Sequence, residues 1–225
     1  KNTAREFFAT VNLTHNREWY NRIYEQRIEN GQVQRVSLPL SNHGSGYTVK
    51  STLSKGFYEL GLKTSFLVLL NISKAEQISG GQRLPYQYRL MRLEPKVIWT
   101  PNRHWETSYQ TDIRYGGNKI GERTRLAPLW NVTQQVQLSY IFSPIEASLS
   151  VDHYHNDVNE DQSVNAVFAD FSVSWKSGRW QITTTATNLF DKRTYAYTQY
   201  ASLESYTSWV RIRPREFLVA IRYQL

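Results

Sequence analysis

His153, His155 and Asp157 are the residues whose types and spacing come nearest to a metal site. They alternate, so a β-strand would direct all three side chains to one face, where imidazole and carboxylate groups are common metal ligands. Asp152 next to His153, or Asp112 brought to a histidine by the fold, could instead activate water in a hydrolase. Polar residues at strand ends are ordinary, and the sequence fixes no further ligand. We therefore predict no metal site, no cofactor and no catalytic residue.

The elements that carry these residues are predicted to be antiparallel β-strands. Apolar and polar residues alternate with period two between turn signals such as Gly, Pro, Asn and Ser. The pattern predicts ten strands, near residues 5–16, 46–55, 57–72, 87–99, 104–115, 129–142, 145–155, 164–176, 179–189 and 213–225.

Tight and long connections alternate along the chain. The tight ones are near 54–56, 100–103, 143–144 and 176–178, and the long ones are near 17–45, 73–86, 116–128, 156–163 and 190–212. Successive antiparallel strands place alternate connections at opposite ends, so one end carries the tight turns and both chain termini. This sorting is typical of outer-membrane barrels. Asn30–Gly31 predicts a hairpin within the first long connection, and Gly80–Gly81 is expected to be a flexible hinge.

The two faces of the predicted strands differ in chemistry. One face is mostly aliphatic, and aromatic residues gather at its two ends, as they do at bilayer interfaces. Near the tight turns these are Tyr58, Trp99, Trp105, Tyr140, Phe142, Trp175, Trp180 and Tyr223, and near the long loops they are Tyr47, Tyr115 and Trp130. The other face is polar and carries ionisable residues of both signs, which would be costly in a dry core. We expect the apolar face to contact lipid and the polar face to surround a pore.

Composition limits the other classes. The chain has 225 residues, no Cys and a net charge of +8. The longest apolar run, Phe66 to Leu70, is far shorter than the roughly 20 residues of a spanning helix. Lys and Arg are scattered rather than clustered, which argues against nucleic acid and favours contact with anionic lipid headgroups. Because Lys1 is not preceded by Met or a signal peptide, we expect a processed or truncated piece.

The end of the chain resembles the last two strands of TonB-dependent receptors of bacterial outer membranes. The segment 188–195 reads Asn-Leu-Phe-Asp-Lys-Arg-Thr-Tyr, and Arg213-Pro214-Arg215 precedes the alternating residues Phe217, Val219, Ile221, Tyr223 and Leu225. In that family an Asn-Leu-Phe-Asp-type sequence ends the penultimate strand, and a Pro-Arg segment opens the last. The remaining strands match by pattern alone. The resemblance assigns this last strand to barrel assembly. Members of the family usually end in an aromatic residue, whereas this chain ends in Leu225.

The resemblance implies that residues 1–225 form one barrel segment, about ten C-terminal strands of a transmembrane β-barrel of about 22 strands. The plug domain and the part that meets TonB would lie N-terminal to it. The implied function is uptake of a ferric siderophore, cobalamin, haem, glycan or peptide across the outer membrane, in some receptors with a surface lipoprotein. Ligand contacts would come from the long loops, where the candidates by residue type are Tyr20, Arg83, Tyr86, Tyr200 and Trp209.

Three alternatives remain open. An outer-membrane protease of the omptin type also has a ten-stranded barrel with acidic and His residues at its rim, although the likeness is in strand number only. A passive porin would conduct ions, and a soluble sandwich would stay monomeric without detergent. A barrel piece with two unpaired edges is expected to aggregate, to close on itself or to pair with a second copy.

Overall fold

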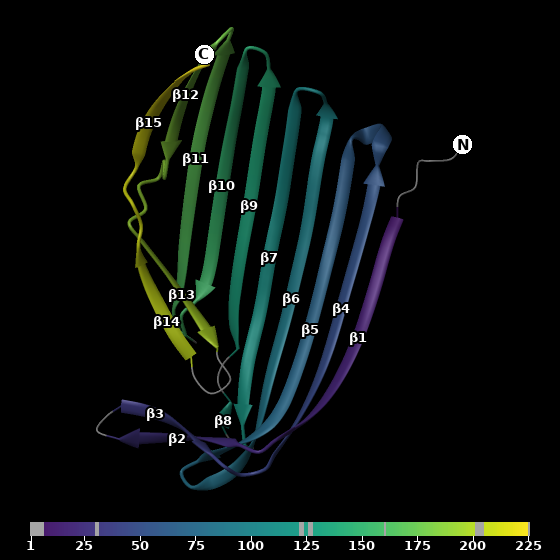
Figure 1. Ribbon diagram of the computed structural model, residues 1–225, viewed down its shortest axis with the longest axis vertical. Coiled ribbons are helices and arrows are strands. Elements are labelled where there is room, and N and C mark those ends of the chain that lie inside the picture. The colour runs from purple at the N-terminus through teal and green to yellow at the C-terminus, as the bar shows by residue number, and fades with distance from the viewer. Residues whose placement is uncertain are drawn as a thin grey trace.

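The computed structural model describes residues 7–29, 32–121, 124–125, 128–159, 161–200 and 205–224. Within them the chain is all-β, and a single-layer sheet of 13 strands dominates (Figure 1). The sheet is antiparallel apart from a short parallel pairing of β2 (Ile23–Glu29) with β5 (Leu62–Ser79). No helix in the described part of the chain is long and apolar enough to span a membrane.

Ten consecutive neighbours form the main path of the sheet. They are β1 (Phe7–Tyr20), β4 (Asn42–Phe57), β5 (Leu62–Ser79), β6 (Gln82–Asn102), β7 (Trp105–Ile120), β9 (Leu129–Phe142), β10 (Ile145–Asp157), β11 (Ser163–Ser177), β12 (Trp180–Thr187) and β15 (Glu216–Tyr223). Each corresponds to one predicted strand, so the prediction of an antiparallel all-β fold is confirmed. The sheet is open, because the described residues of β1 and β15 form its two edges and do not pair with each other.

The predicted long loops differ most from the structure. The loop expected at 73–86 is a continuation of β5 and β6, joined by a two-residue turn at Gly80 and Gly81. Both glycines have positive φ, 57° and 74°, which a type I′ hairpin turn requires, so the expected hinge is a tight turn. Gly116 and Gly117, also expected in a loop, lie within β7.

Two further hairpins occupy the other long connections. The first connection contains β2 (Ile23–Glu29) and β3 (Gln32–Leu38), paired as expected, although the turn at 30–31 lies outside the described residues. The last contains β13 (Thr194–Tyr200) and β14 (Ser205–Arg211), which form a separate two-stranded sheet. The short β8 (Thr124–Arg125) pairs with the end of β7. In Figure 1 these extensions gather at one end of the main sheet, opposite the tight turns.

The tight turn between β4 and β5 differs in detail from its prediction. Residues Tyr58–Leu60 form one 3-10 turn, η1, so β5 begins at Leu62 rather than at 57. Gly61 follows with φ 61°, and a Cβ there would lie 2.0 Å from the carbonyl oxygen of Thr100. The Thr100 amide donates to the Gly61 carbonyl at 2.8 Å. The turn therefore requires glycine both for its backbone conformation and for this close approach to the next hairpin.

Cross-strand register gives the main sheet one mostly apolar face, which Thr111, Gln134, His153 and His155 interrupt on β7, β9 and β10. One row runs through Val68, Leu93, Ile113 and Val132, and another through Leu138, Leu149, Phe171, Ala186 and Phe217. No second layer covers this face within the described residues, whose buried apolar residues are Ile23, Tyr86, Leu129, Ala166, Ala169, Ala186 and Ala196. Val219, for example, is 66% exposed. A sheet of this size without a core on its apolar face needs an apolar environment or a partner.

Aromatic residues end this apolar face on both sides, as predicted. At the tight-turn end Trp105 pairs with Tyr140 and Trp180 with Tyr223, with ring centroids 4.6 and 4.8 Å apart. At the other end Tyr115 pairs with Trp130 at 4.6 Å. We call these two sets the inner and the outer girdle. Tyr58 lies in η1 and not in a strand, and it is exposed beside the inner girdle.

The opposite, polar face carries rows of hydrophilic residues. One row runs through Lys96, Gln110, Gln135 and Asp152, and another through Ser139, Ser148, Ser172 and Thr185. The register also places Leu67 and Leu69 on this face, so it is not uniformly polar.

Candidate functional site

The Asn-Leu-Phe-Asp segment forms the turn that ends β12 and redirects the chain. Asn188 has a positive φ of 51°, which Asn tolerates better than most residues. Its side-chain amide donates to the carbonyls of Lys192 and Arg213, each at 2.8 Å, and its Oδ1 accepts from the Lys192 amide at 3.0 Å. One buried side chain thus joins the two ends of the β13–β14 excursion.

Asp191 completes the same turn. It also has positive φ, 50°, and its amide donates to the Asn188 carbonyl at 2.8 Å. Its carboxylate accepts from the Arg215 amide and from the Arg193 guanidinium, both at 2.9 Å. The Asn and the Asp of the motif therefore have structural roles in the folded chain, holding the segment that opens β15.

The β13–β14 hairpin crosses the polar face of the sheet. Asn156 of β10, only 3% exposed, donates to the Tyr195 hydroxyl at 2.9 Å and to the Ala196 carbonyl at 3.3 Å. Thr198 donates to the carbonyl of Val158 at 3.0 Å. The Tyr195 ring packs edge-on against Tyr154, with centroids 5.1 Å apart. These contacts fix the hairpin over β10 and β11.

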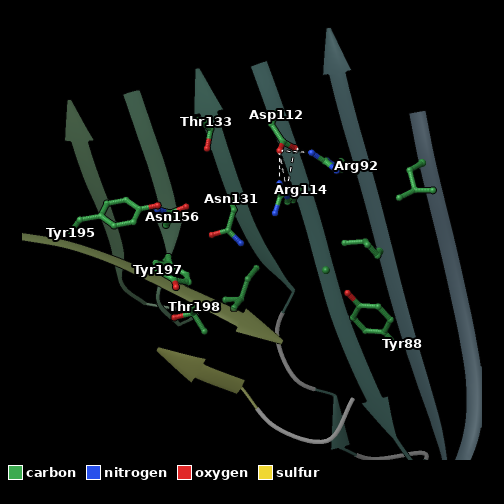
Figure 2. A pocket seen from close by; sticks show the side chains of 14 residues that line it. Tyr88, Arg92, Asp112, Arg114, Asn131, Thr133, Asn156, Tyr195, Tyr197 and Thr198 are labelled. Atoms are coloured by element: carbon green, nitrogen blue, oxygen red, sulfur yellow. Dashed lines mark hydrogen bonds and ion pairs between the residues drawn. The ribbon is translucent and has the colours of Figure 1, made fainter. Parts of the chain in front are cut away.

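A cavity of about 470 Å³ lies between this hairpin and the polar face (Figure 2). Its lining is Leu69, Tyr88, Leu90, Arg92, Asp112, Arg114, Gly116, Leu129, Asn131, Thr133, Asn156, Tyr195, Tyr197 and Thr198. Hydroxyl, amide and charged groups enter it from β6, β7, β9, β10 and β13. The cavity can therefore hold a polar ligand of small-molecule size.

A cluster of ion pairs forms one wall of the cavity. Asp112 accepts two hydrogen bonds from Arg92, at 3.0 and 3.1 Å, and its Oδ2 lies 2.6 Å from Arg114 Nη2 (Figure 2). Arg92 also pairs with Glu94. Since both guanidiniums are already engaged by Asp112, that carboxylate is poorly suited to take up a proton in catalysis. Asn131 is different, because its buried Oδ1 has no hydrogen-bond partner among the described residues and could accept a hydrogen bond from a ligand.

Three of the five predicted ligand residues lie around a second, smaller cavity of about 260 Å³ at the base of the β2–β3 hairpin. Tyr20 and Tyr86 both line it. Arg83 lies beside it, donating from Nε to Glu76 at 2.7 Å and from Nη2 to the Ser41 carbonyl at 2.5 Å. The sequence thus identified residues that the fold brings together from two separate strands, β1 and β6.

Tyr86 is a poor ligand group in spite of its position. It is 7% exposed, and its hydroxyl donates to Asn118 Oδ1 at 3.2 Å. Burial raises the pKa of Tyr86 far above the ordinary tyrosine value, so its hydroxyl stays neutral and remains a donor. Its role in the structure is to support the cavity wall.

The remaining two candidates lie on the β13–β14 hairpin. Trp209 is 69% exposed on β14 and does not line either cavity. Tyr200 ends β13, and its side chain lies outside the described residues. The sequence missed Asn131, Asn156 and Thr198, since nothing in their local pattern shows that a distant hairpin folds over them.

The residues considered first for chemistry are not brought together as a set, although His155 and Asp157 are in contact. Adjacent strand residues point to opposite faces, so Asp152 and His153 cannot act as a pair. His155 Nε2 lies 3.5 Å from Asp157, and His153 instead contacts Gln134. Among the described residues no group of three His, Asp or Glu side chains could hold a metal ion.

Comparisons of the chain with family models, with curated proteins and with solved structures found no match.

Loss of the Asn156 side chain should release the hairpin without unfolding the sheet. Asn156→Ala leaves the Tyr195 hydroxyl and the Ala196 carbonyl without their donor, at a cost of about 1–2 kcal/mol in local stability. Amide hydrogen exchange in β13 should then accelerate roughly tenfold, while exchange in β9 is unchanged. Asn165→Ala, which removes an exposed contact with His155, is the matched control. Equal exchange in both variants would contradict the anchoring role of Asn156.

Proposed function

We propose that this chain is part of the wall of a transmembrane β-barrel in the bacterial outer membrane, and that the barrel is a TonB-dependent receptor that imports a scarce nutrient. The observation that carries the proposal is the uncovered apolar face, which ends in an aromatic girdle on each side. Lipid is the environment that such a face requires.

The spacing of the girdles supports this orientation. Tyr115 lies ten residues beyond Trp105 on β7, about 33 Å along a strand at roughly 3.3 Å per residue. With the tilt of about 40° usual for barrel strands, the apolar band is about 25 Å tall, which matches the hydrocarbon thickness that such barrels span.

The connections and edges support a larger barrel. Tight turns lie at one end and long extensions at the other, as in barrels with short periplasmic turns and long extracellular loops. The unpaired edges of β1 and β15 would be joined by further strands, to about 22 in a plugged transporter. In this proposal β15, with Phe217, Val219, Ile221 and Tyr223 on its apolar face, is the strand used in barrel assembly. Leu225 lies outside the described residues.

The polar face then surrounds the lumen. The cavity beneath β13–β14 and the smaller one near Tyr20 would lie along the ligand route. The nutrient is proposed within the classes of ferric siderophore, cobalamin, haem, and glycan or peptide. A plug domain, TonB and, in some systems, a surface lipoprotein are the proposed partners.

Growth on limiting nutrients tests the transport proposal. A strain lacking the whole protein, and a strain lacking TonB, should both lose growth on the same nutrient class when it is the limiting source. Unimpaired growth of the deletion strain across the panel would contradict a role in uptake. Ion conductance of the purified protein in planar bilayers would favour a passive porin, and peptide cleavage lost in Asp112→Ala would favour a protease.

A further inference from the structure

Charged residues are sorted by height on the apolar face. Between the two girdles, the outward-facing residues of β5, β6, β7 and β9 include no Asp, Glu, Lys or Arg. On β5, β6 and β7, the first charged residues beyond the outer girdle on this face are Lys74, Arg89 and Lys119. All three are cations, and they lie on three neighbouring strands.

Register places these cations in one triangle. Lys74 and Lys119 both pair with Gln87, so their Cα atoms are about 10 Å apart across two strand spacings. Arg89 lies two residues from Gln87 on the same strand, which makes it a diagonal neighbour of both lysines at about 7–8 Å. We call Lys74, Arg89 and Lys119 the cation triangle. Its size suits an anion that several donors contact at once.

The triangle is exposed and uncompensated. All three side chains are exposed, and none forms an ion pair within the described residues. The nearest acid on the strand of Lys74 is Glu76, whose carboxylate is bound by Arg83. The hydrogen bond of Arg89 goes to the neutral Gln87 at 3.2 Å and leaves its charge unbalanced.

The surface directly below the triangle is apolar. On β5 the outward residues Leu70 and Ile72 precede Lys74, and on β6 Met91 lies two residues from Arg89. Acyl chains that pack along these residues would bring a headgroup to the height of the cations. Lys and Arg supply many N–H donors and positive charge, which is the complement of a phosphate group.

We propose that the cation triangle binds the phosphate groups of an anionic glycolipid headgroup in the leaflet at the long-loop end of the sheet. This site faces the bilayer and is distinct from the nutrient route on the polar face. It rests on the proposed membrane orientation, because only that orientation places the triangle at the headgroup layer.

The test compares two triple variants of the whole protein in phosphatidylcholine bilayers with and without lipid A, a glycolipid with two phosphates. The first variant combines Lys74→Gln, Arg89→Gln and Lys119→Gln. The matched control combines Lys50→Gln, Lys63→Gln and Lys96→Gln, which removes equal charge from the polar face of β4, β5 and β6. Lipid A retained by the extracted protein is measured by native mass spectrometry.

Each Lys or Arg side chain at the headgroup layer raises the affinity for lipid A roughly fivefold. The first variant should therefore lose affinity for lipid A on the order of a hundredfold, and the control should retain it. Equal lipid A affinity in the two variants would overturn the proposal, as would binding of inorganic phosphate as tight as that of lipid A. A wild-type protein that inserts into phosphatidylcholine but shows no preference for lipid A would overturn this site alone. Failure to insert into phosphatidylcholine would overturn the membrane orientation as well.

Discussion

Replacing Asn188 with alanine will destabilise the junction of β12, β13 and β15 by about 3–5 kcal/mol. The substitution removes three part-buried hydrogen bonds, two to the carbonyls of Lys192 and Arg213 and one from the Lys192 amide, at about 1 kcal/mol each. Alanine also tolerates the positive φ of this position less well than Asn, which adds about 1 kcal/mol. Urea unfolding of the detergent-solubilised protein, followed by tryptophan fluorescence, measures the loss.

Two further variants separate the contributions at this position. Asn188→Gly restores the backbone freedom but not the hydrogen bonds. Compared with Asn188→Ala, it should therefore recover only about 1 kcal/mol of the free energy of unfolding. Lys192→Ala is the control, because Lys192 contributes main-chain groups to the turn and its side chain is exposed. An Asn188→Ala protein as stable as Lys192→Ala would show that the turn does not depend on this amide.

The substitution Val136→Arg will destabilise the membrane-inserted protein by about 2–4 kcal/mol. Val136 is on β9 between Trp130 of the outer girdle and Tyr140 of the inner girdle, and it faces outward between Tyr109 and Val151. In the proposed orientation this is near the middle of the bilayer, where a charged side chain facing lipid carries that cost. Reversible unfolding from lipid vesicles in guanidinium measures the change.

The adjacent residue provides the matched control. Gln137 follows Val136 on the same strand and points to the polar face, where Ser108 and Ser150 are its neighbours. Gln137→Arg adds the same charge at the same height, and its expected cost is below about 1 kcal/mol. Similar losses from the two arginines would mean that the faces do not differ in environment.

The ten main strands could be predicted because one face of each is mostly apolar between the two girdles. That requirement imposes the period-two alternation seen, for example, in Val132, Val136 and Leu138 of β9, and it fixes register as well as strand type. The girdle residues were predictable for the same reason, since amphipathic rings gather where the apolar surface ends.

The extensions beyond the outer girdle could not be predicted in this way. Residues 73–86 form paired strands, but both faces there mix polar and apolar residues, so the alternation that marks a strand is lost. Backbone pairing continues without this alternation. The one usable signal was Gly80–Gly81, a turn sequence that fits a two-residue hairpin better than a hinge.

The candidate site was predicted in part. Residue type alone identified Tyr20, Arg83 and Tyr86, which the fold brings together, but it also identified Trp209, which lies apart. The larger cavity depends on Asn188 directing β13–β14 back over the polar face. Its contacts join residues about 40 positions apart, such as Asn156 and Ala196, and no local pattern contains that information.

In the proposed orientation, the apolar face meets lipid while the polar face meets water. The chain contains no Cys, so single cysteines carrying spin labels can be placed at Leu138 and Val219 on one face and at Glu106 and Asp170 on the other. Collision rates with oxygen and with a water-soluble nickel complex are then measured in bilayers. We expect the collision rate with oxygen to exceed that with the nickel complex at Leu138 and Val219, and the reverse at Glu106 and Asp170. Nickel access at Leu138 and Val219, or no difference between the faces, would contradict it.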